Sequence, residues 1–173
     1  MKNEVLNALI NRRSCRAYTS QMPSEEDLKT ILEAGLYAPS GKNLQSSVMV
    51  CVTDKETVNL LSNLNAQVMN SDSDPFYGAP AVIAVLGDSN CPIYVQDASL
   101  VMQNLMLAAH SLNLASCWIN RGFEVFRSLE GKKLKEKWNI PDSYEGVAFC
   151  ILGYSAEPAL EAKPRRDGRI IFA

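Results

Sequence analysis

The segment from Asp97 to Leu114 constrains the fold most, because its helical pattern is apolar on nearly every side. Its apolar residues are Ala98, Leu100, Val101, Met102, Leu105, Met106, Leu107, Ala108, Ala109 and Leu112. A helix without a polar face must be buried all round. In a chain of 173 residues the simplest place for it is between two subunits, so we expect an obligate homodimer. The alternative is a central core helix in a monomer.

The patterns on either side of this helix predict an α+β fold in which helices cover both faces of an apolar sheet. One helix opens at Ser24, which is placed to cap it, and is stopped by Pro39. The other expected helices lie at residues 3–13, 55–69 and 124–138, the last as one helix or as two short ones. Strands are expected at residues 47–53, 80–86, 117–119 and 146–152, with a last short one at 169–172. No linker of Pro, Gly or Ser divides the chain, so residues 1–173 are expected to form a single domain.

Composition excludes several classes of function. Seventeen Lys and Arg against nineteen Asp and Glu give a net charge of −2, which argues against general nucleic-acid binding. The five cysteines are scattered and include no CxxC pair, as is typical of free thiols in a reducing compartment. The first residues lack the apolar region of a signal peptide, and no stretch approaches the roughly 20 apolar residues of a membrane span. We therefore expect a cytoplasmic protein with neither nucleic acid nor membrane as a partner.

Residues that usually carry side-chain catalysis are scarce in this chain. It has no GxG pair and no GK[ST], so neither the dinucleotide fingerprint nor the P-loop is present. His110 is the only histidine, and we interpret it as a core histidine with one hydrogen bond rather than as a member of a catalytic triad. A single histidine among scattered cysteines also argues against a zinc site. If the protein is an enzyme, we expect an organic cofactor to carry the chemistry.

Two basic clusters and one polar loop are the candidate binding motifs. Residues 12–16, with three arginines and Ser14, offer the donors that suit a phosphate, or merely complement the dipole of the first helix. Residues 163–166 are a solvated tail, or a second cluster that converges on the same anion. In the loop 38–45, Asn43 and Gln45 present the donors and acceptors that suit a uracil-like edge, or the loop is an ordinary turn.

Taken in order, these motifs resemble the nitroreductase family of flavoproteins. The resemblance continues through Pro75–Pro80, Asp97–His110, Ser116–Ile119 and Leu152–Tyr154. It therefore covers nearly the whole chain in the expected order, which makes it far more specific than any one motif.

The resemblance implies an intertwined homodimer of α+β subunits, each with a central, mostly antiparallel sheet flanked by helices, and two FMN molecules at the subunit interface. The residues implied to contact FMN are Arg12, Arg13, Ser14, Arg16, Pro39, Ser40, Gly41, Asn43, Gln45, Trp118, Ile119, Asn120, Lys163 and Arg165. Within this set, Arg12, Ser14, Lys163 and Arg165 correspond to the groups that hold the phosphate, and Arg16 to a cation near the pyrimidine edge. The loop 39–45 corresponds to a loop from the other subunit. Residues 118–121 correspond to a backbone segment that lies against the flavin ring and offers an N–H to its N5.

The resemblance also implies a reaction. Such flavoproteins take a hydride from NADH or NADPH at N5 and reduce a nitroaromatic, a quinone or a related electrophile by a ping-pong mechanism, with no side chain required as a catalyst. This chain departs from many relatives in two ways. Ser46 and Ser47 stand where a Pro-Trp pair is common, and only one helix fits between Thr53 and Pro80, where larger relatives place lid helices. These departures motivate an alternative, a flavin-binding storage, sensor or partner-reduced module with little turnover of NAD(P)H.

Overall fold

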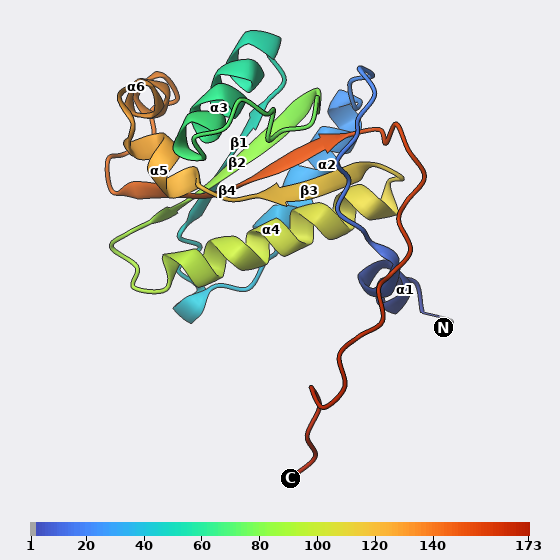
Figure 1. Ribbon diagram of the computed structural model, residues 1–173. Coiled ribbons are helices and arrows are strands. Elements are labelled where there is room, and N and C mark those ends of the chain that lie inside the picture. Colours follow the sequence, from blue (N-terminus) through green and yellow to red (C-terminus); the bar gives the residue numbers. More distant parts are fainter. Residues whose placement is uncertain (1–2) are drawn as a thin grey trace.

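A four-stranded sheet forms the middle of the computed structural model, which describes residues 3–173 (Figure 1). The strands lie in the order β1-β2-β4-β3 and every pairing is antiparallel. Their bounds are Ser47–Val52 for β1, Ala81–Asp88 for β2, Ala115–Ile119 for β3 and Tyr144–Gly153 for β4. The four strands expected from the apolar runs are therefore confirmed, and so is the mostly antiparallel sheet.

Helices cover both faces of this sheet (Figure 1). Their bounds are Glu4–Asn11 for α1, Glu25–Leu36 for α2, Lys55–Val68 for α3, Tyr94–Ser111 for α4, Gly122–Arg127 for α5 and Leu129–Lys137 for α6, with a 3₁₀ turn, η1, at Gly41–Asn43. The predicted cap is confirmed, since the Ser24 hydroxyl accepts a hydrogen bond from the Asp27 N–H at 3.0 Å. The segment expected at 124–138 is a pair of short helices.

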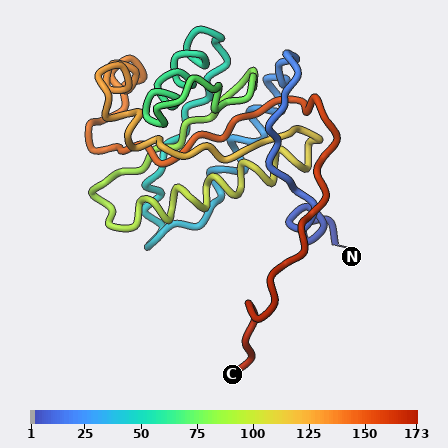
Figure 2. The backbone as a smooth tube through the Cα atoms, in the orientation of Figure 1, coloured from blue at the N-terminus to red at the C-terminus, as the bar shows by residue number. Residues whose placement is uncertain are grey.

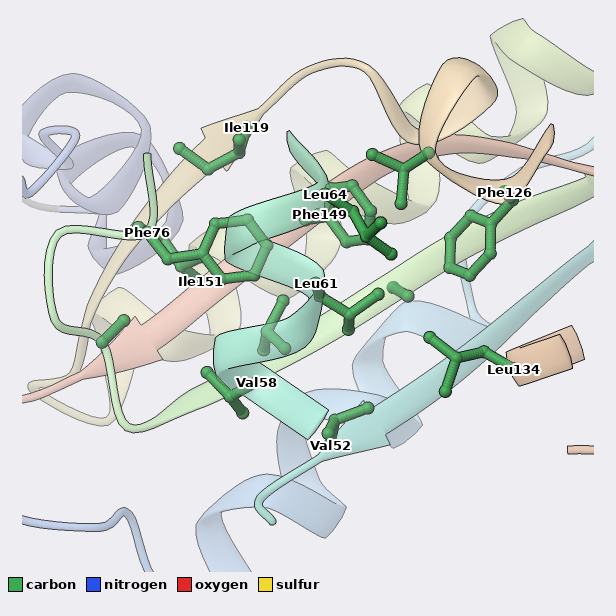
Figure 3. Close-up of a cluster of buried hydrophobic side chains, with 14 of the residues drawn as sticks. Val52, Val58, Leu61, Leu64, Phe76, Ile119, Phe126, Leu134, Phe149 and Ile151 are labelled. Carbon is green, nitrogen blue, oxygen red and sulfur yellow. The ribbon is translucent and has the colours of Figure 1, made fainter. Parts of the chain in front are cut away.

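The core between the sheet and helices α3 and α5 is built around aromatic rings (Figure 3). Phe149 of β4 packs against Phe76 and Phe126, with ring centroids 5.4 and 5.7 Å apart. Leu61 and Leu64 of α3 complete the same cluster. Each buried side chain of this size contributes roughly 1.5–3 kcal/mol, so this face anchors α3 and α5 firmly.

The core on the opposite face is formed by α2 and α4. Met102 and Leu105 of α4 are fully buried against Ile83 of β2 and Ile31 of α2. The outer side of α4 is different, because Val95 and Leu100 are 46% and 42% exposed. One chain therefore leaves part of this helix exposed, and the homodimer stays a prediction.

The structure differs from two expectations about secondary structure, and it tests the expected absence of a membrane span for residues 3–173 alone. The long helix begins at Tyr94 rather than near Asp97, because the turn after β2 closes early, with the Tyr94 N–H bonded to the Cys91 carbonyl at 3.1 Å. Residues 169–172 form no strand, since both edges of β4 are already paired with β2 and β3 and the tail runs away from the body (Figure 2). Within residues 3–173, no helix combines the length and apolarity needed to cross a membrane.

Candidate functional site

The first basic cluster lies beside the start of β3 and the C-terminal end of α4. Ser14 forms a parallel bridge with Ser116, and the Cys15 N–H donates to the Ser116 carbonyl at 3.0 Å. A second bridge joins Tyr18 to Ser155, so the start of the C-terminal tail crosses the same region (Figure 2). These contacts bring both ends of the chain to one side of the molecule.

A cavity of about 280 Å³ opens between these segments. The side chains that line it come from the basic cluster, from α4 and β3, and from the first part of the tail, and include Arg12, Arg13, Ser14, Arg16, His110, Ser116 and Leu160. Four of the predicted FMN-contacting residues are therefore gathered at one cavity. His110 is half-buried at its wall, so it is not the enclosed core histidine that we expected.

Several polar atoms around this cavity are buried without a hydrogen-bond partner among residues 3–173. They are Nη1 of Arg12, Nε of Arg13 and the hydroxyl of Ser116. Buried polar groups are nearly always paired, and two of these donors belong to cationic groups. Arg13 is also fixed in place, since its Nη1 donates to the carbonyls of Ile10 and Arg12 at 2.7 and 2.8 Å. A set of unpaired guanidinium donors and a hydroxyl fits an anion such as a phosphate monoester.

Two buried thiols and one phenol near this cavity, those of Cys117, Cys150 and Tyr18, are held in their neutral forms. Burial raises the pKa of Cys117, and the Ser14 hydroxyl and the nearby Arg16 only partly oppose it. Burial likewise raises the pKa of Cys150 and of Tyr18. Neutral, buried thiols are poor nucleophiles. Within residues 3–173, no three His, Cys, Asp or Glu side chains are gathered so that they could hold a metal ion.

The loop that follows α2 is attached to the other end of α4. The Gly41 N–H and the Ser46 hydroxyl each donate to one oxygen of the Asp97 carboxylate, both at 3.0 Å. Asp97 is only 3% exposed. Gly41 packs closely against the side chain of Ile93, since a Cβ at this position would lie 2.1 Å from Cδ1 of Ile93. Ser46 thus helps to hold the loop.

This loop presents its predicted site residues in an unusual backbone shape. Lys42, Asn43 and Gln45 all have positive φ angles, of 51°, 54° and 50°. The shape is supported by the Gln45 N–H, which donates to the Ser40 hydroxyl at 3.0 Å, and by the Gln45 side-chain amide, which donates to Asn43 at 3.3 Å. Pro39, Asn43 and Gln45 are exposed. Such conformations in non-glycine residues cluster at ligand-binding and active sites.

One chain does not bring this loop to the cavity. Helix α4 has 18 residues, which at 1.5 Å per residue span about 27 Å. The loop 39–46 contacts its first turn, whereas the cavity lies at its last turn. Two halves of the predicted FMN site therefore lie at opposite ends of one helix.

The third predicted segment ends strand β3. Trp118 and Ile119 belong to the strand, and the Trp118 ring N–H donates to the Asn120 side chain. The carbonyl of Asn120 accepts a hydrogen bond from the Asn65 side chain of α3 at 2.7 Å. Arg121 follows with a φ of 74°, before α5 begins. This is a second backbone segment held in a strained shape.

The second basic cluster lies apart from the cavity in the single chain. The tail lines the cavity only as far as Leu160, and Lys163 and Arg165 are exposed beyond it. Residues 156–173 form no helix or strand, so nothing within the chain holds these cations in place. Their convergence with Arg12 stays a prediction.

Four residues near the site were not assigned to it from the sequence, namely Asn65, Asp97, His110 and Ser116. Asp97 and Asn65 carried a usable signal, since each is a polar residue on the inward side of a helix whose other inward residues are mostly apolar. Ser116 and His110 carried none, because only the fold places them at the cavity.

Comparison with known proteins agrees with this geometry. The model of the nitroreductase family matches residues 9–154. A protein of Archaeoglobus fulgidus, named by inference an NADH dehydrogenase/NAD(P)H nitroreductase, is 32% identical over 87% of this chain and 85% of its own. The NADPH-flavin oxidoreductase of Vibrio harveyi is 30% identical over 98% of this chain and 72% of its own.

A solved structure shows the same fold. The nitroreductase of Bacteroides fragilis with bound FMN is 30% identical and has a TM-score of 0.90, with 99% of this chain and 100% of the other covered. The match of the family model extends over most of the chain, from α1 to the end of the sheet. The chain belongs to the nitroreductase family.

Proposed function

We propose that this protein is an FMN-dependent oxidoreductase that uses NADH or NADPH as its electron donor. The observation that carries the proposal is the cavity at the end of α4, where Arg12, Arg13 and Ser116 present buried donors without partners. An FMN phosphate would pair with these donors. The proposal is supported by the bound FMN of the Bacteroides fragilis nitroreductase and by the name of the Vibrio harveyi NADPH-flavin oxidoreductase.

Different residues of this chain would bind different parts of FMN. Arg12, Arg13 and Ser14 would hold the phosphate, with Lys163 and Arg165 as further contacts from the tail. Arg16, exposed at the mouth of the cavity, would supply positive charge at the pyrimidine edge, where a cation favours the reduced, anionic ring. When bound, FMN supplies the redox chemistry by accepting a hydride from the nicotinamide and passing two electrons to a second substrate.

The side chains of the protein would bind and orient the reactants rather than act as catalysts. The cavity is lined by no pair of carboxylates that could act as general acid and general base, so we assign its residues to binding. We propose nitroaromatics, quinones or related electrophiles as the second substrates, reduced in a ping-pong sequence.

We further propose that two copies of the chain form the working unit. A two-fold pairing with antiparallel α4 helices would bring the loop 39–46 of one chain to the cavity of the other, about 27 Å along the helix. It would also cover apolar residues that one chain leaves exposed, which are Val5, Leu6, Leu9, Ile10, Val95, Leu100, Ile170, Ile171 and Phe172. A subunit interface that covered them would remove this apolar surface from water.

The activity is tested with the purified protein. It should bind FMN with a yellow colour, and mixing with NADH or NADPH should bleach the flavin rapidly, with recovery on adding a quinone or a nitroaromatic. A colourless protein that FMN does not reconstitute would overturn the proposal. Flavin that binds but is bleached by neither nicotinamide would overturn the NAD(P)H-dependent activity and favour the partner-reduced module.

The shared site is tested by subunit complementation. Arg12→Ala and Asn43→Ala each damage one half of the site, so each variant alone should retain FMN weakly. If the two halves come from different chains, a mixed dimer has one site with both defects and one intact site, and it regains half of the wild-type FMN. If both halves came from the same chain, every site in the mixed dimer would be defective and no FMN would be regained.

A further inference from the structure

Asn65 is a polar residue at a core position of α3. The inward side of this helix is otherwise mostly apolar, with Val58, Leu61 and Leu64 in the aromatic core (Figure 3). Asn65 is 0% exposed, and its Oδ1 has no hydrogen-bond partner in the chain. A buried unsatisfied polar atom costs about 1–3 kcal/mol, so a leucine here would suit the core better. Packing alone does not explain the amide.

The Asn65 amide makes one hydrogen bond, and its partner is a backbone group outside the apolar core. Its Nδ2 donates to the carbonyl of Asn120 at 2.7 Å, across the gap between α3 and the residue after β3. The side chain of Asn120 is held separately, by the ring N–H of Trp118. Asn120 is therefore fixed both at its carbonyl and at its side chain.

The peptide that follows is oriented by this contact. The bond between Asn120 and Arg121 is trans, and a peptide unit is planar, so fixing the carbonyl also fixes the direction of the Arg121 N–H. Arg121 itself has a positive φ of 74°. The next residue, Gly122, packs closely against β4, since a Cβ there would lie 2.9 Å from backbone atoms of Val147 and Ala148. A strained residue persists only where its surroundings determine it.

We infer that Asn65 is a positioning residue for the flavin ring: it holds the Asn120–Arg121 peptide so that its N–H meets the edge of the bound ring. This inference rests on the proposed FMN site, because the segment 118–121 is the one expected to lie against the ring. Asn65 does not touch FMN in this scheme and acts through the backbone of Asn120. Its role is distinct from merely joining α3 to the sheet, which the apolar side chains of α3 already do.

The experiment compares the wild-type protein with Asn65→Leu and with a matched control, Asn63→Leu, which makes the same change at an exposed position of α3. Leucine removes the hydrogen bond without leaving a cavity, so the Tm of the flavin-free protein should not fall. Amide hydrogen exchange of residues 118–123 should speed up about tenfold in Asn65→Leu and stay unchanged in Asn63→Leu.

The bound flavin gives a second readout. The N5 of oxidised FMN accepts a hydrogen bond, whereas in reduced FMN it carries a hydrogen, so a released N–H should weaken binding of the oxidised form more. An approximately tenfold change in the ratio of the two affinities raises the midpoint potential by about 30 mV. The visible spectrum of bound FMN should shift in Asn65→Leu alone.

The inference is overturned if Asn65→Leu matches Asn63→Leu in hydrogen exchange, potential and spectrum. Should Asn65→Leu not fold, Asn65→Ala takes its place with the same criteria, since it too lacks the donor. A wild-type protein that binds no FMN would instead overturn the proposed function, while the exchange measurement on flavin-free protein would still decide whether Asn65 fixes the loop.

Discussion

The buried polar groups at the two ends of α4 differ in whether they have hydrogen-bond partners within the chain. At the first turn, both oxygens of Asp97 accept hydrogen bonds from the loop 39–46, and the negative charge is favoured by the helix dipole. At the last turn, donors of Arg12 and Arg13 and the hydroxyl of Ser116 are buried without partners. One end is complete within a single chain, and the other is not.

This difference separates a structural contact from a binding site. A buried donor without a partner costs about 1–3 kcal/mol, which is recovered when an anion arrives. The end at Asp97 offers no such gain, because its groups are already paired. Substitutions at the two ends should therefore affect different properties, stability at one and ligand affinity at the other.

The largest expected effect is on FMN affinity in Arg12→Ala. Loss of a charge-assisted hydrogen bond to the phosphate is worth about 1.5–3 kcal/mol, which weakens binding roughly 10- to 150-fold. The Tm of the flavin-free protein should not fall, because the variant also removes a buried, unpaired donor. Fluorescence titration with FMN measures the affinity, and Lys132→Ala, an exposed cation on α6, is the control. Equal FMN affinity in Arg12→Ala and wild type would contradict the assignment of the phosphate site.

The next effect is on folding stability in Asp97→Ala. The Gly41 N–H and the Ser46 hydroxyl lose their acceptor, which should lower the free energy of unfolding by about 1–3 kcal/mol and the Tm by several degrees. Ser46→Ala removes only one of the two bonds, so its effect should be smaller. Thermal unfolding of flavin-free protein measures both, with exposed Asp72→Ala as the control. A Tm of Asp97→Ala equal to that of Asp72→Ala would show that the loop does not depend on this carboxylate.

A smaller effect is expected from inorganic phosphate. Because the cavity suits an anion, phosphate should raise the Tm of the flavin-free protein above that in chloride at equal ionic strength. At ten times its Kd, a ligand of the native state adds about 1.4 kcal/mol. The increment should disappear in Arg12→Ala and persist in Asp97→Ala. An increment that survives in Arg12→Ala would place the anion elsewhere.

The smallest effect on stability is expected at Asp54, which lies at neither end of α4 and serves as a reference for the effects there. Asp54 caps α3, and its bonds from the Thr57 hydroxyl and N–H hold the pKa of its carboxyl below the usual range. Because the pKa is lower in the folded state, the unfolded chain binds more protons over this pH range. The stability that the ionised Asp54 contributes is therefore present above the ordinary pKa and is lost as the pH falls through the lowered value. Asparagine also caps helices but does not ionise. Urea unfolding should show a stability difference between wild type and Asp54→Asn at pH 6 that vanishes near pH 2, and a constant difference would exclude this origin.

The sequence predicted most of the elements because local rules decide them. Ser24 before an acidic first turn marks the start of α2, and the apolar run 47–53 forms β1 because β2 is available as its partner. The exact start of α4 was left open because it depends on a turn at Cys91, and the last strand is absent because the tail runs away from the sheet in one chain. A short extended run forms a strand only where a partner is available.

The site was predictable in part for a similar reason. The motif residues 12–16 are found at the cavity, since their neighbours in sequence share its wall. His110 and Asp97 could not be placed, because their surroundings come from segments far away in the chain. Helical periodicity shows which side of a helix is apolar, but not which loop docks on its polar residues.

The length of α4 has a consequence for the whole assembly. If two chains pair with these helices antiparallel, the length of the helix sets the distance between the two flavins at about 27 Å. Electrons would not pass readily between cofactors at such a spacing, so each site would complete its own cycle. Inserting or deleting a single turn would pull the loop of one chain out of register with the cavity of its neighbour, and both active sites would be lost together.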